Sequence, residues 1–205
     1  MGLYSRHVLP RLIDGLCGLE AITEQRRKVV PHATGVVLEV GIGSGLNLPL
    51  YDPERVTRVI GVDPDDAMWR RSARRRSLCP FPIERIGLSG EEIPLETGCA
   101  ETVLVTYALC TIPDPRAALT EMRRVLRPGG RLLFLEHGEA PAPAVRRWQQ
   151  RIAPLWRRIA GGCHPDRPIL RLIEDAGWRT ECLEQGYIKG PKPLTYNYWG
   201  WAKSA

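Results

Sequence analysis

The residues best suited to chemistry gather in one short stretch, where a carboxylate precedes three glycines at alternate positions. Glu39 is followed by Gly41, Gly43 and Gly45, and the run that contains it, Val36–Val40, is otherwise aliphatic and mostly β-branched. Such a run predicts a strand buried on both faces of a parallel sheet. Glycines directly after a strand predict a tight turn whose backbone lies close to a ligand. The stretch indicates a nucleotide site at the carboxyl end of a strand, and a plain strand-to-helix turn is the alternative.

The segment after the glycines, Leu46–Leu48, predicts the first turn of a helix, with Asn47 inside it. The N-terminus of a helix presents free N–H groups and positive dipole to a ligand, so Asn47 is assigned to the site. A dinucleotide site requires glycines at the first, third and sixth positions of its turn. Counted from Gly41 the sixth position is Leu46, and counted from Gly43 it is Leu48. The spacing therefore argues against a dinucleotide.

A second carboxylate follows the next apolar run, Val59–Val62, at Asp63, which lies 18 residues after Gly45. At about this spacing in a strand–helix–strand unit, a carboxylate can accept hydrogen bonds from both hydroxyls of a nucleotide ribose. Asp63 could also cap the helix expected after it, and the two roles can coexist. Pro64, the next residue, is assigned to the same site.

The loops after the third and fourth predicted strands, 83–88 and 102–106, should reach the same rim of the sheet. Loops on that rim carry the ligands of open α/β sheets. Five of their residues are assigned to the nucleotide: Ser89, Gly90, Glu91, Tyr107 and Leu109. Cys110, which comes next, is expected to line the acceptor pocket rather than to act as a nucleophile.

The fifth predicted strand, 132–135, leads into Glu136 and His137. Imidazole titrates near neutrality, which makes His137 the first candidate for a general base. A structural hydrogen bond that anchors the strand end is the alternative reading of this histidine.

Composition limits the class of protein. The chain has 205 residues, 43% of them hydrophobic, and a net charge of +6, which suits one globular domain with a sizeable core. The six cysteines show no paired or zinc-like spacing, so we expect reduced thiols, no metal and a cytoplasmic location. No apolar run approaches the roughly 20 residues that span a bilayer, and no signal peptide is visible. Arginine clusters could favour an acidic surface, although without a nucleic-acid motif we regard RNA as a minor option.

Two amphipathic segments are expected to flank the site. Residues 3–30 predict a helical cap, with Tyr4 and His7 placed over the substrate; a helix packed on the sheet edge is the alternative. Residues 140–162 predict a basic helix with Trp148 and Trp156 on its apolar face. An interfacial membrane helix has this pattern, but we prefer a helix that covers the substrate pocket, because Pro154 interrupts the pattern.

The remaining periodicity predicts the rest of the architecture. Helices are expected over 68–77, 115–126 and 168–176, and two final strands over 178–185 and 194–201. We divide the single domain into an N-terminal cap at 1–33, a cofactor-binding core at 34–137, a helical substrate cover at 138–177 and a closing strand pair at 178–202.

The acid followed by Gly-x-Gly-x-Gly resembles motif I of the class I S-adenosylmethionine (SAM) methyltransferases, and the run Leu126–Gly130 is similar to one found widely among them. This resemblance implies a Rossmann-like α/β fold: a seven-stranded, mostly parallel sheet with a closing antiparallel strand and helices on both faces. It implies SAM as cofactor and S-adenosylhomocysteine as product. An acid is welcome near the cationic cofactor, which suits Glu39. In enzymes acting on ubiquinone and menaquinone precursors, an aspartate that contacts the adenine stands where this chain has Ser89.

A finer resemblance covers roughly residues 34–202. The stretches 106–111, 134–137, 148–150 and 162–163 are similar to the enzymes that methylate alkyl thiols in animal membranes. It implies a small-molecule acceptor, with a thiol as the favoured class. Those enzymes carry an apolar N-terminal anchor, whereas residues 1–30 here are too polar for one. A lipid or quinone head group at a membrane surface, and a non-catalytic SAM-binding protein, stay open as alternatives, as do a monomer and a homodimer.

Overall fold

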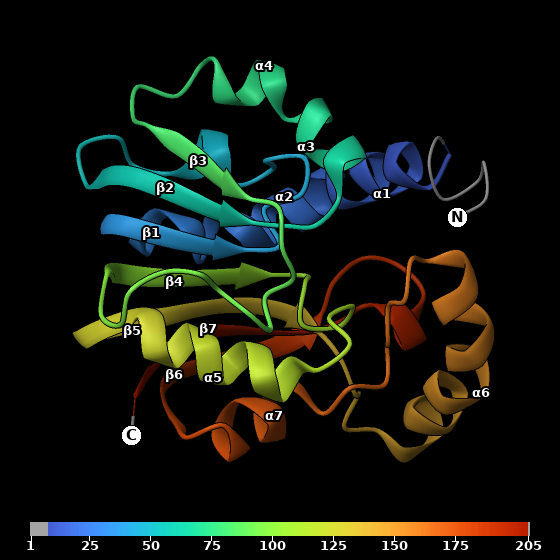
Figure 1. Ribbon diagram of the computed structural model, residues 1–205. Helices are drawn as coiled ribbons and strands as arrows, with labels where there is room; N and C mark the ends of the chain where they lie inside the picture. Colours follow the sequence, from blue (N-terminus) through green and yellow to red (C-terminus); the bar gives the residue numbers. More distant parts are fainter. Residues whose placement is uncertain (1–7, 205) are drawn as a thin grey trace.

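The computed structural model describes residues 8–204, and its centre is a seven-stranded sheet with the order β3-β2-β1-β4-β5-β7-β6 (Figure 1). The strands are β1 (Gly35–Val40), β2 (Val56–Val62), β3 (Ile83–Ile86), β4 (Ala100–Thr106), β5 (Leu126–His137), β6 (Trp178–Tyr187) and β7 (Tyr196–Ser204). Strands β1 to β5 pair in parallel, and β7 pairs antiparallel with both β5 and β6. The predicted mostly parallel sheet with a closing antiparallel strand is confirmed.

The sheet is apolar on both faces because each face is covered. Leu38 and Val40 of β1 join one core together with α5 (Pro115–Val125) and α7 (Ile169–Asp175). Val37, which points the other way, joins a second core built by residues 29–33 and the segment after the glycine loop. Alternation along the strand assigns Glu39 to the same face as Val37.

The predicted helix after the glycine loop is wrong. The chain forms only the 3₁₀ turn η3 (Leu48–Leu50) and becomes extended at Tyr51. Proline disfavours helical conformation in the residue before it and lacks a backbone donor; Pro49 lies inside this turn and Pro53 follows it. The turn lies against the second core through the buried Leu48.

Two other predicted helices are each split in two. The N-terminal segment forms α1 (Leu9–Cys17) and α2 (Glu20–Arg27), separated at Gly18, and the segment after Asp63 forms α3 (Asp66–Arg71) and α4 (Ala73–Arg76). The second break falls at Ser72, whose hydroxyl donates to the Trp69 carbonyl at 2.7 Å. Side-chain bonds of this kind compete with the regular helix pattern. Strand β5 also begins earlier than predicted, at Leu126, through an irregular pairing with β4.

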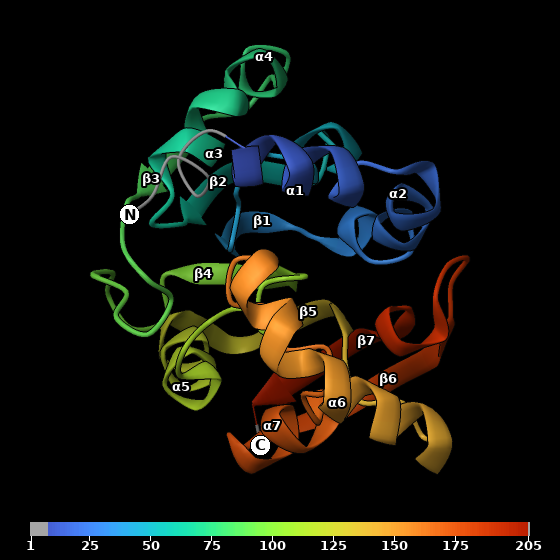
Figure 2. The ribbon, with the colours of Figure 1, turned by 90° about the vertical axis from the view of Figure 1, so that its right-hand side faces the viewer.

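Two helices stand at the carboxyl ends of the parallel strands, on the side that faces the viewer in Figure 2. These are α1 and α6 (Pro143–Ile159), with Pro154 inside α6. A 3₁₀ turn, η4 (Lys192–Leu194), lies beside α6. Across residues 8–204, no helix combines the length and the apolar character needed to cross a membrane. Helix α1 covers the cavity described next.

Candidate active site

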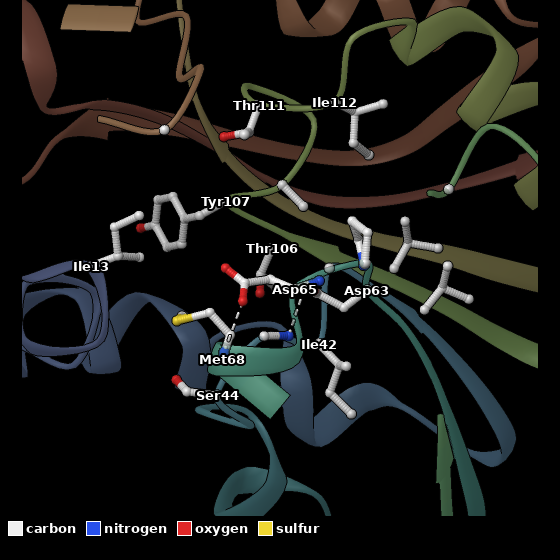
Figure 3. A pocket seen from close by; sticks show the side chains of 18 of the residues that line it. Ile13, Ile42, Ser44, Asp63, Asp65, Met68, Thr106, Tyr107, Thr111 and Ile112 are labelled. Carbon is white, nitrogen blue, oxygen red and sulfur yellow. Dashed lines mark hydrogen bonds between the residues drawn. The ribbon is translucent and has the colours of Figure 1, made fainter. Parts of the chain in front are cut away.

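A cavity of about 470 Å³ opens at the carboxyl ends of β1, β2 and β4, beneath α1. Its size falls in the range of small-molecule and cofactor sites, which runs from roughly 300 to 1,000 Å³. Eight residues assigned from the sequence to the nucleotide line it: Glu39, Gly41, Gly43, Asp63, Pro64, Ser89, Gly90 and Tyr107. Figure 3 shows the cavity with Asp63 and Met68 on one side and Tyr107, Thr111 and Ile112 on the other.

The glycine loop adopts a backbone that other residues rarely tolerate. Gly41, Gly43 and Gly45 all have positive φ, at 79°, 50° and 74°. A Cβ on Gly41 would also lie 2.4 Å from the Cβ of Ala108, so the loops that follow β1 and β4 approach each other there. Gly45 does not line the cavity and packs against Leu48 from behind. The glycines therefore fix a sharp turn and keep side chains out of the cavity at Gly41 and Gly43.

Asp63 fixes the other side of this loop. One carboxylate oxygen accepts a hydrogen bond from Gly43 N at 2.9 Å, and the other accepts from Asp65 N at 2.8 Å. The helix cap predicted for Asp63 is made instead by Asp65, which accepts from Ala67 N and Met68 N. Burial raises the pKa of Asp63, although the two backbone donors oppose that shift. Asp63 remains free to accept further hydrogen bonds from a ligand in the cavity.

Glu39 is the centre of a buried network. Its side chain accepts from Asn47 Nδ2 at 2.8 Å and from the Tyr51 hydroxyl at 2.7 Å, and the residue is 1% exposed. Asn47 therefore supports the site from below and does not line the cavity. Burial raises the pKa of Glu39 to about 7, against the lowering effect of its hydrogen bonds with Tyr51 and Asn47. A cation in the cavity would favour the ionised carboxylate.

Arg26 of α2 was not predicted from the sequence, yet it reaches into the same network. Its Nη1 donates to Asn47 Oδ1 at 2.8 Å and to Thr106 Oγ1 at 2.6 Å, and its guanidinium lies 5.2 Å from the ring centre of Tyr107. The residue is 5% exposed and lines the cavity, and its Nε is buried without a partner. An unpaired buried donor is costly, so this guanidinium is suited to an anionic group of a ligand.

Ser89 and Glu91 after β3 are linked, since the Ser89 hydroxyl is hydrogen-bonded to Glu91 Oε2. Glu91 also accepts from Asp114 N at 2.7 Å and does not line the cavity. Ser89 thus lines the cavity with its own hydroxyl proton already engaged. A hydroxyl oxygen in that state can accept a hydrogen bond from an exocyclic amino group.

Tyr107 has the only positive φ, 53°, among non-glycine residues in the described part of the chain. Its hydroxyl donates to the buried Asn197 at 2.8 Å, and its ring points toward Ile13 of α1 in Figure 3. Strain of this kind concentrates at functional sites and is held by the surrounding structure. Leu109, two residues on, is fully buried in the core, and only its backbone is engaged near the rim.

Helix α1 forms the roof of the cavity, and a hydrogen bond between Asp14 and Ser44 joins it to the glycine loop. Asp14 accepts from the Ser44 hydroxyl at 2.6 Å and pairs with Arg71 at 2.7 Å and Arg75 at 3.2 Å. Burial opposes the charge of Asp14, but the hydrogen bonds with Ser44 and Arg71 lower its pKa overall. The inner face of α1 contributes apolar or thiol side chains to the lining: Leu9, Pro10, Ile13 and Cys17. Tyr4 and His7, expected here from the sequence, lie outside the described residues.

The predicted cover of the cavity by α6 is not what the structure shows. No residue of α6 lines the cavity, and only Gly161, from the turn after it, does so. Trp148 is 57% exposed and Leu155 is 64% exposed, so the apolar face of α6 points largely to solvent. Trp156 is half-buried but does not reach the cavity either. The helix turns away because its inner face is fixed by the buried Gln149, which bonds the backbone at Gly138 and Pro165.

Cys110 and His137 lie one layer behind the cavity wall, together with Cys163. His137 Nε2 is 3.1 Å from Cys163 Sγ, and the donor atoms of all three residues lie within 4.8 Å of one another. Hydrogen bonding with Cys163, and then the nearby His137, holds the pKa of the Cys110 thiol well below its usual range despite burial. Burial opposes a charge on His137, but the neighbouring Cys110 raises its pKa. The sequence pattern did not connect these residues.

The comparisons with known proteins agree with this geometry. The family described as "Methyltransferase domain" matches residues 38–134. The human thiol S-methyltransferase TMT1B is 34% identical over 178 residues, which are 82% of this chain and 69% of that protein. The chain therefore belongs to the class I SAM-dependent methyltransferases, and SAM is its cofactor.

Two further similarities show the breadth of this family. The phosphatidylethanolamine N-methyltransferase of Cereibacter sphaeroides is 30% identical over 168 residues, with 78% of each chain covered. A solved SAM-dependent methyltransferase of Thermotoga maritima superposes with a TM-score of 0.68 at 18% identity, covering 98% of each chain. The last of these supports the fold alone.

Some lining residues could have been found from the sequence, and others could not. Thr106 is the last residue of a predicted strand at the rim. Alternation along β4 puts its side chain on the sheet face that also carries Glu39, where it accepts a hydrogen bond from Asn47. Arg26, Ile13 and Cys17 carry no local signal, because their positions depend on how α1 and α2 fold back over the sheet. Met68 lies in the first turn of α3, and the path of the loop before that helix decides whether its side chain faces the cavity.

Proposed function

We propose that this enzyme transfers the methyl group of SAM to the sulfur of a small, apolar thiol. The observation that carries the proposal is the division of the cavity into two sides. The carboxylates Glu39, Asp63 and Asp65 come from β1 and the end of β2, whereas Ile13, Ile112 and Pro113 form an apolar wall from α1 and the β4 loop. A neutral, soft acceptor suits that wall better than a charged one, because an unpaired buried charge is costly.

Similarity to named enzymes supports the same choice. The human protein TMT1B, which is 34% identical to this chain over the aligned region, is named a thiol S-methyltransferase. The human protein TMT1A, which is 31% identical, is also named a thiol S-methyltransferase. The phosphatidylethanolamine enzyme instead acts on a lipid amine, by its name. The apolar wall is the feature that favours the first kind of acceptor for this chain.

The carboxylate side of the cavity is assigned to the cofactor. Asp63 would accept hydrogen bonds from the ribose hydroxyls, and Ser89 would accept one from the adenine amino group. Glu39 would offset the positive charge of the methionine portion, while Arg26 would bind its carboxylate with the donors that the protein leaves unused. Charge-assisted hydrogen bonds of this kind are about twice as strong as neutral ones.

The bound cofactor supplies a methyl group already activated by a positive sulfur. The chain's own task is to align the acceptor in line with that methyl group and to exclude water. Helix α1 closes the cavity, and the latch of Asp14 on Ser44 holds the helix against the glycine loop. A thiol with a pKa near ~8.5 needs only modest help to ionise at neutral pH. The predicted base, His137, does not line the cavity, so its part in this step is not direct.

The test is a panel of acceptors assayed by release of S-adenosylhomocysteine. Short alkyl thiols should be methylated, and matched alkyl amines and phenols should give at most a small fraction of that rate. The rate should rise with pH through the pKa of the thiol, since the thiolate is the nucleophile. Ready methylation of phospholipid amines or quinol precursors, with no reaction of simple thiols, would show that the acceptor assignment is wrong while leaving the fold and cofactor intact.

A second candidate, an acceptor taken from a membrane surface, is favoured by one specific observation. Leu12 and Leu16 of α1 are exposed, as is Leu19 just after it; so are Trp148 and Leu155 of α6, and both helices stand at the carboxyl ends of the parallel strands (Figure 2). Exposed apolar residues on a helix as rich in arginine as α6 are typical of interfacial binding. Sedimentation with anionic vesicles tests this: binding should be lost in a Leu16→Glu, Leu155→Glu variant, and a wild-type protein that stays in the supernatant would exclude this candidate.

A further inference from the structure

The cluster behind the cavity wall brings together three metal-binding side chains from distant parts of the chain. Cys110 comes from the loop after β4, His137 from the end of β5, and Cys163 from the turn after α6. Cys110 is 2% exposed and Cys163 is 9% exposed, while His137 is half-buried. In residues 8–204, no other group of three such side chains lies close enough together to hold an ion.

The fold holds each of the three segments in place. The buried carboxylate of Glu136 accepts from the backbone N–H groups of Ala108 at 2.7 Å and Leu109 at 2.9 Å, which fixes the loop that carries Cys110. Arg167 donates to the carbonyl of Ile112 at 2.7 Å and also to that of Leu109. His164 N donates to the Cys110 carbonyl at 2.8 Å, so the segment of Cys163 is tied directly to the same loop. These bonds preorganise the cluster without using its donor atoms.

The turn that delivers Cys163 requires an unusual backbone. Gly161 and Gly162 both have positive φ, at 63° and 90°. A Cβ on Gly161 would touch Leu9 and Ile13 of α1, and one on Gly162 would lie 3.7 Å from Thr111. The turn is therefore packed between the roof of the cavity and the loop of Cys110. Such a turn is well placed to bring a side chain to a defined point.

The distances fit a tetrahedral ion of the zinc type. With Zn–S near ~2.3 Å and Zn–N near ~2.05 Å, two ligand sulfurs would be about 3.8 Å apart, and sulfur and nitrogen about 3.5 Å apart. The Cys163–His137 distance of 3.1 Å needs to open by only a few tenths of an ångström, and all separations are at most 4.8 Å. Two thiolates and a neutral imidazole would also cancel the charge of a divalent ion, which suits a buried site.

We propose that Cys110, His137 and Cys163 bind one thiophilic divalent cation, Zn²⁺ by their chemistry, with a fourth coordination position left for the sulfur of the acceptor. Three protein ligands with an open position characterise catalytic rather than structural zinc sites. This proposal rests on the proposed thiol acceptor for its fourth ligand, but the three-residue site stands independently of it.

The cluster adjoins the acceptor side of the cavity. Thr111, which lines the cavity, has its hydroxyl oxygen 3.6 Å from Cys110 Sγ, and the ring of Tyr107 lies 6.2 Å from that of His137. Gly161, two residues before Cys163, lines the cavity as well. A thiol that coordinates the ion gives up its proton to solvent and becomes a bound thiolate. Its sulfur then forms the new bond to the methyl carbon as the bond from that carbon to the cofactor sulfur breaks, so no added oxidant or reductant is needed.

The experiment is a titration of the reduced, metal-free full chain with Co²⁺ in the absence of SAM and acceptor. We expect one equivalent to bind, with tetrahedral visible bands and a thiolate-to-cobalt charge-transfer band, and one equivalent of Zn²⁺ to displace it. Cys110→Ser and Cys163→Ser should each lower the charge-transfer intensity by about half, and the double variant should abolish it. Cys182→Ser, on strand β6 away from the cluster, is the matched control and should match the wild type.

The fourth position is tested with the cobalt protein and a small alkyl thiol. The thiol should increase the charge-transfer intensity by one further increment, whereas its methyl thioether should not. Circular dichroism and calorimetry of SAM binding verify that each variant is folded. A folded, reduced wild type that takes up no Co²⁺ or Zn²⁺, or a double serine variant that binds them as tightly, would overturn the site. Metal uptake without thiol methylation would leave the three-residue site intact and refute the proposed acceptor. Metal uptake without the added charge-transfer intensity on thiol addition would refute the acceptor sulfur as fourth ligand.

Discussion

Replacing Asp63 by alanine removes the carboxylate that joins β2 to the glycine loop. In the structure this group accepts from Gly43 N and Asp65 N, with one bond to each oxygen. Two ribose hydroxyls would add charge-assisted bonds on the cavity side, in exchange for water. The net gain from such an exchange is ~1.5–3 kcal/mol. Because ~1.4 kcal/mol corresponds to a factor of ten, Asp63→Ala should weaken SAM binding by about ten- to a hundredfold.

This value is a lower bound, because the variant also frees the backbone donor of Gly43. Asp63→Asn separates the two effects in part: its amide keeps one acceptor, but its NH₂ group must face one of two backbone donors. We expect the asparagine variant to lose nearly as much affinity as the alanine variant.

Isothermal calorimetry with SAM measures the change, and circular dichroism verifies the fold. Asp52→Ala is the matched control, since Asp52 accepts from the backbone N–H of Glu54, two residues on, just as Asp63 accepts from that of Asp65. Asp52 lies outside the cavity lining, so its variant should bind SAM normally. A folded Asp63→Ala protein with SAM affinity within twofold of the wild type would remove Asp63 from the site.

Three further predictions concern the same cavity. Arg26→Gln should weaken binding of SAM at least about tenfold yet leave decarboxylated SAM nearly unaffected, because the lost charge-assisted bond is to the carboxylate; equal losses for both ligands in calorimetry would contradict this. Gly43→Ala should abolish SAM binding, whereas Gly129→Ala, with a φ of 80° but no atom within 4 Å of its new Cβ, should show only the ~1–2 kcal/mol backbone penalty on denaturant unfolding. SAM binding by Gly43→Ala as well as by Gly129→Ala would mean that the glycine loop at 41–45 is only a turn. Finally, because Glu39 has a pKa of about 7 and its ionised form favours a cation, SAM affinity should rise about fivefold from pH 6 to pH 7 and become flat in Glu39→Gln.

The parts of the fold that could be predicted are those specified by local pattern. The β-branched runs before Gly41 and Asp63 are strands because a parallel sheet buries both faces, and both cores confirm this. The helix predicted after the glycines from Leu46 and Leu48 does not form, because Pro49 lies inside η3 and Pro53 follows it closely. Local proline chemistry overrides hydrophobic periodicity over so short a span.

The residues of the site likewise divide into those that local sequence pattern positions and those that long-range packing positions. Glu39, Asp63 and the glycines are close in sequence to the strand ends that position them, so their rim could be inferred directly. The direction of the Trp148 side chain could not be inferred, because a helix can either bury or expose its apolar stripe. The hydrogen bonds of Gln149 decide which face of α6 turns inward. The meeting of Cys110 with Cys163 depends on loop closure over 53 residues, which no local spacing records.

The buried network beneath the cavity gives the N-terminal helices a part in binding the cofactor. Glu39 and Arg26 belong to the same hydrogen-bond network but do not contact each other directly: Asn47 bonds both of them, and Thr106 accepts from Arg26 and Asn47. Arg26 therefore compensates the carboxylate only at a distance, which is consistent with a Glu39 pKa that stays raised by burial. A ligand that brings an ammonium group to Glu39 and a carboxylate to Arg26 satisfies both charges at once. Since Arg26 belongs to α2 and Asp14 fixes α1, ordering of these helices and binding of an amino-acid-bearing cofactor should be coupled, with each stabilising the other.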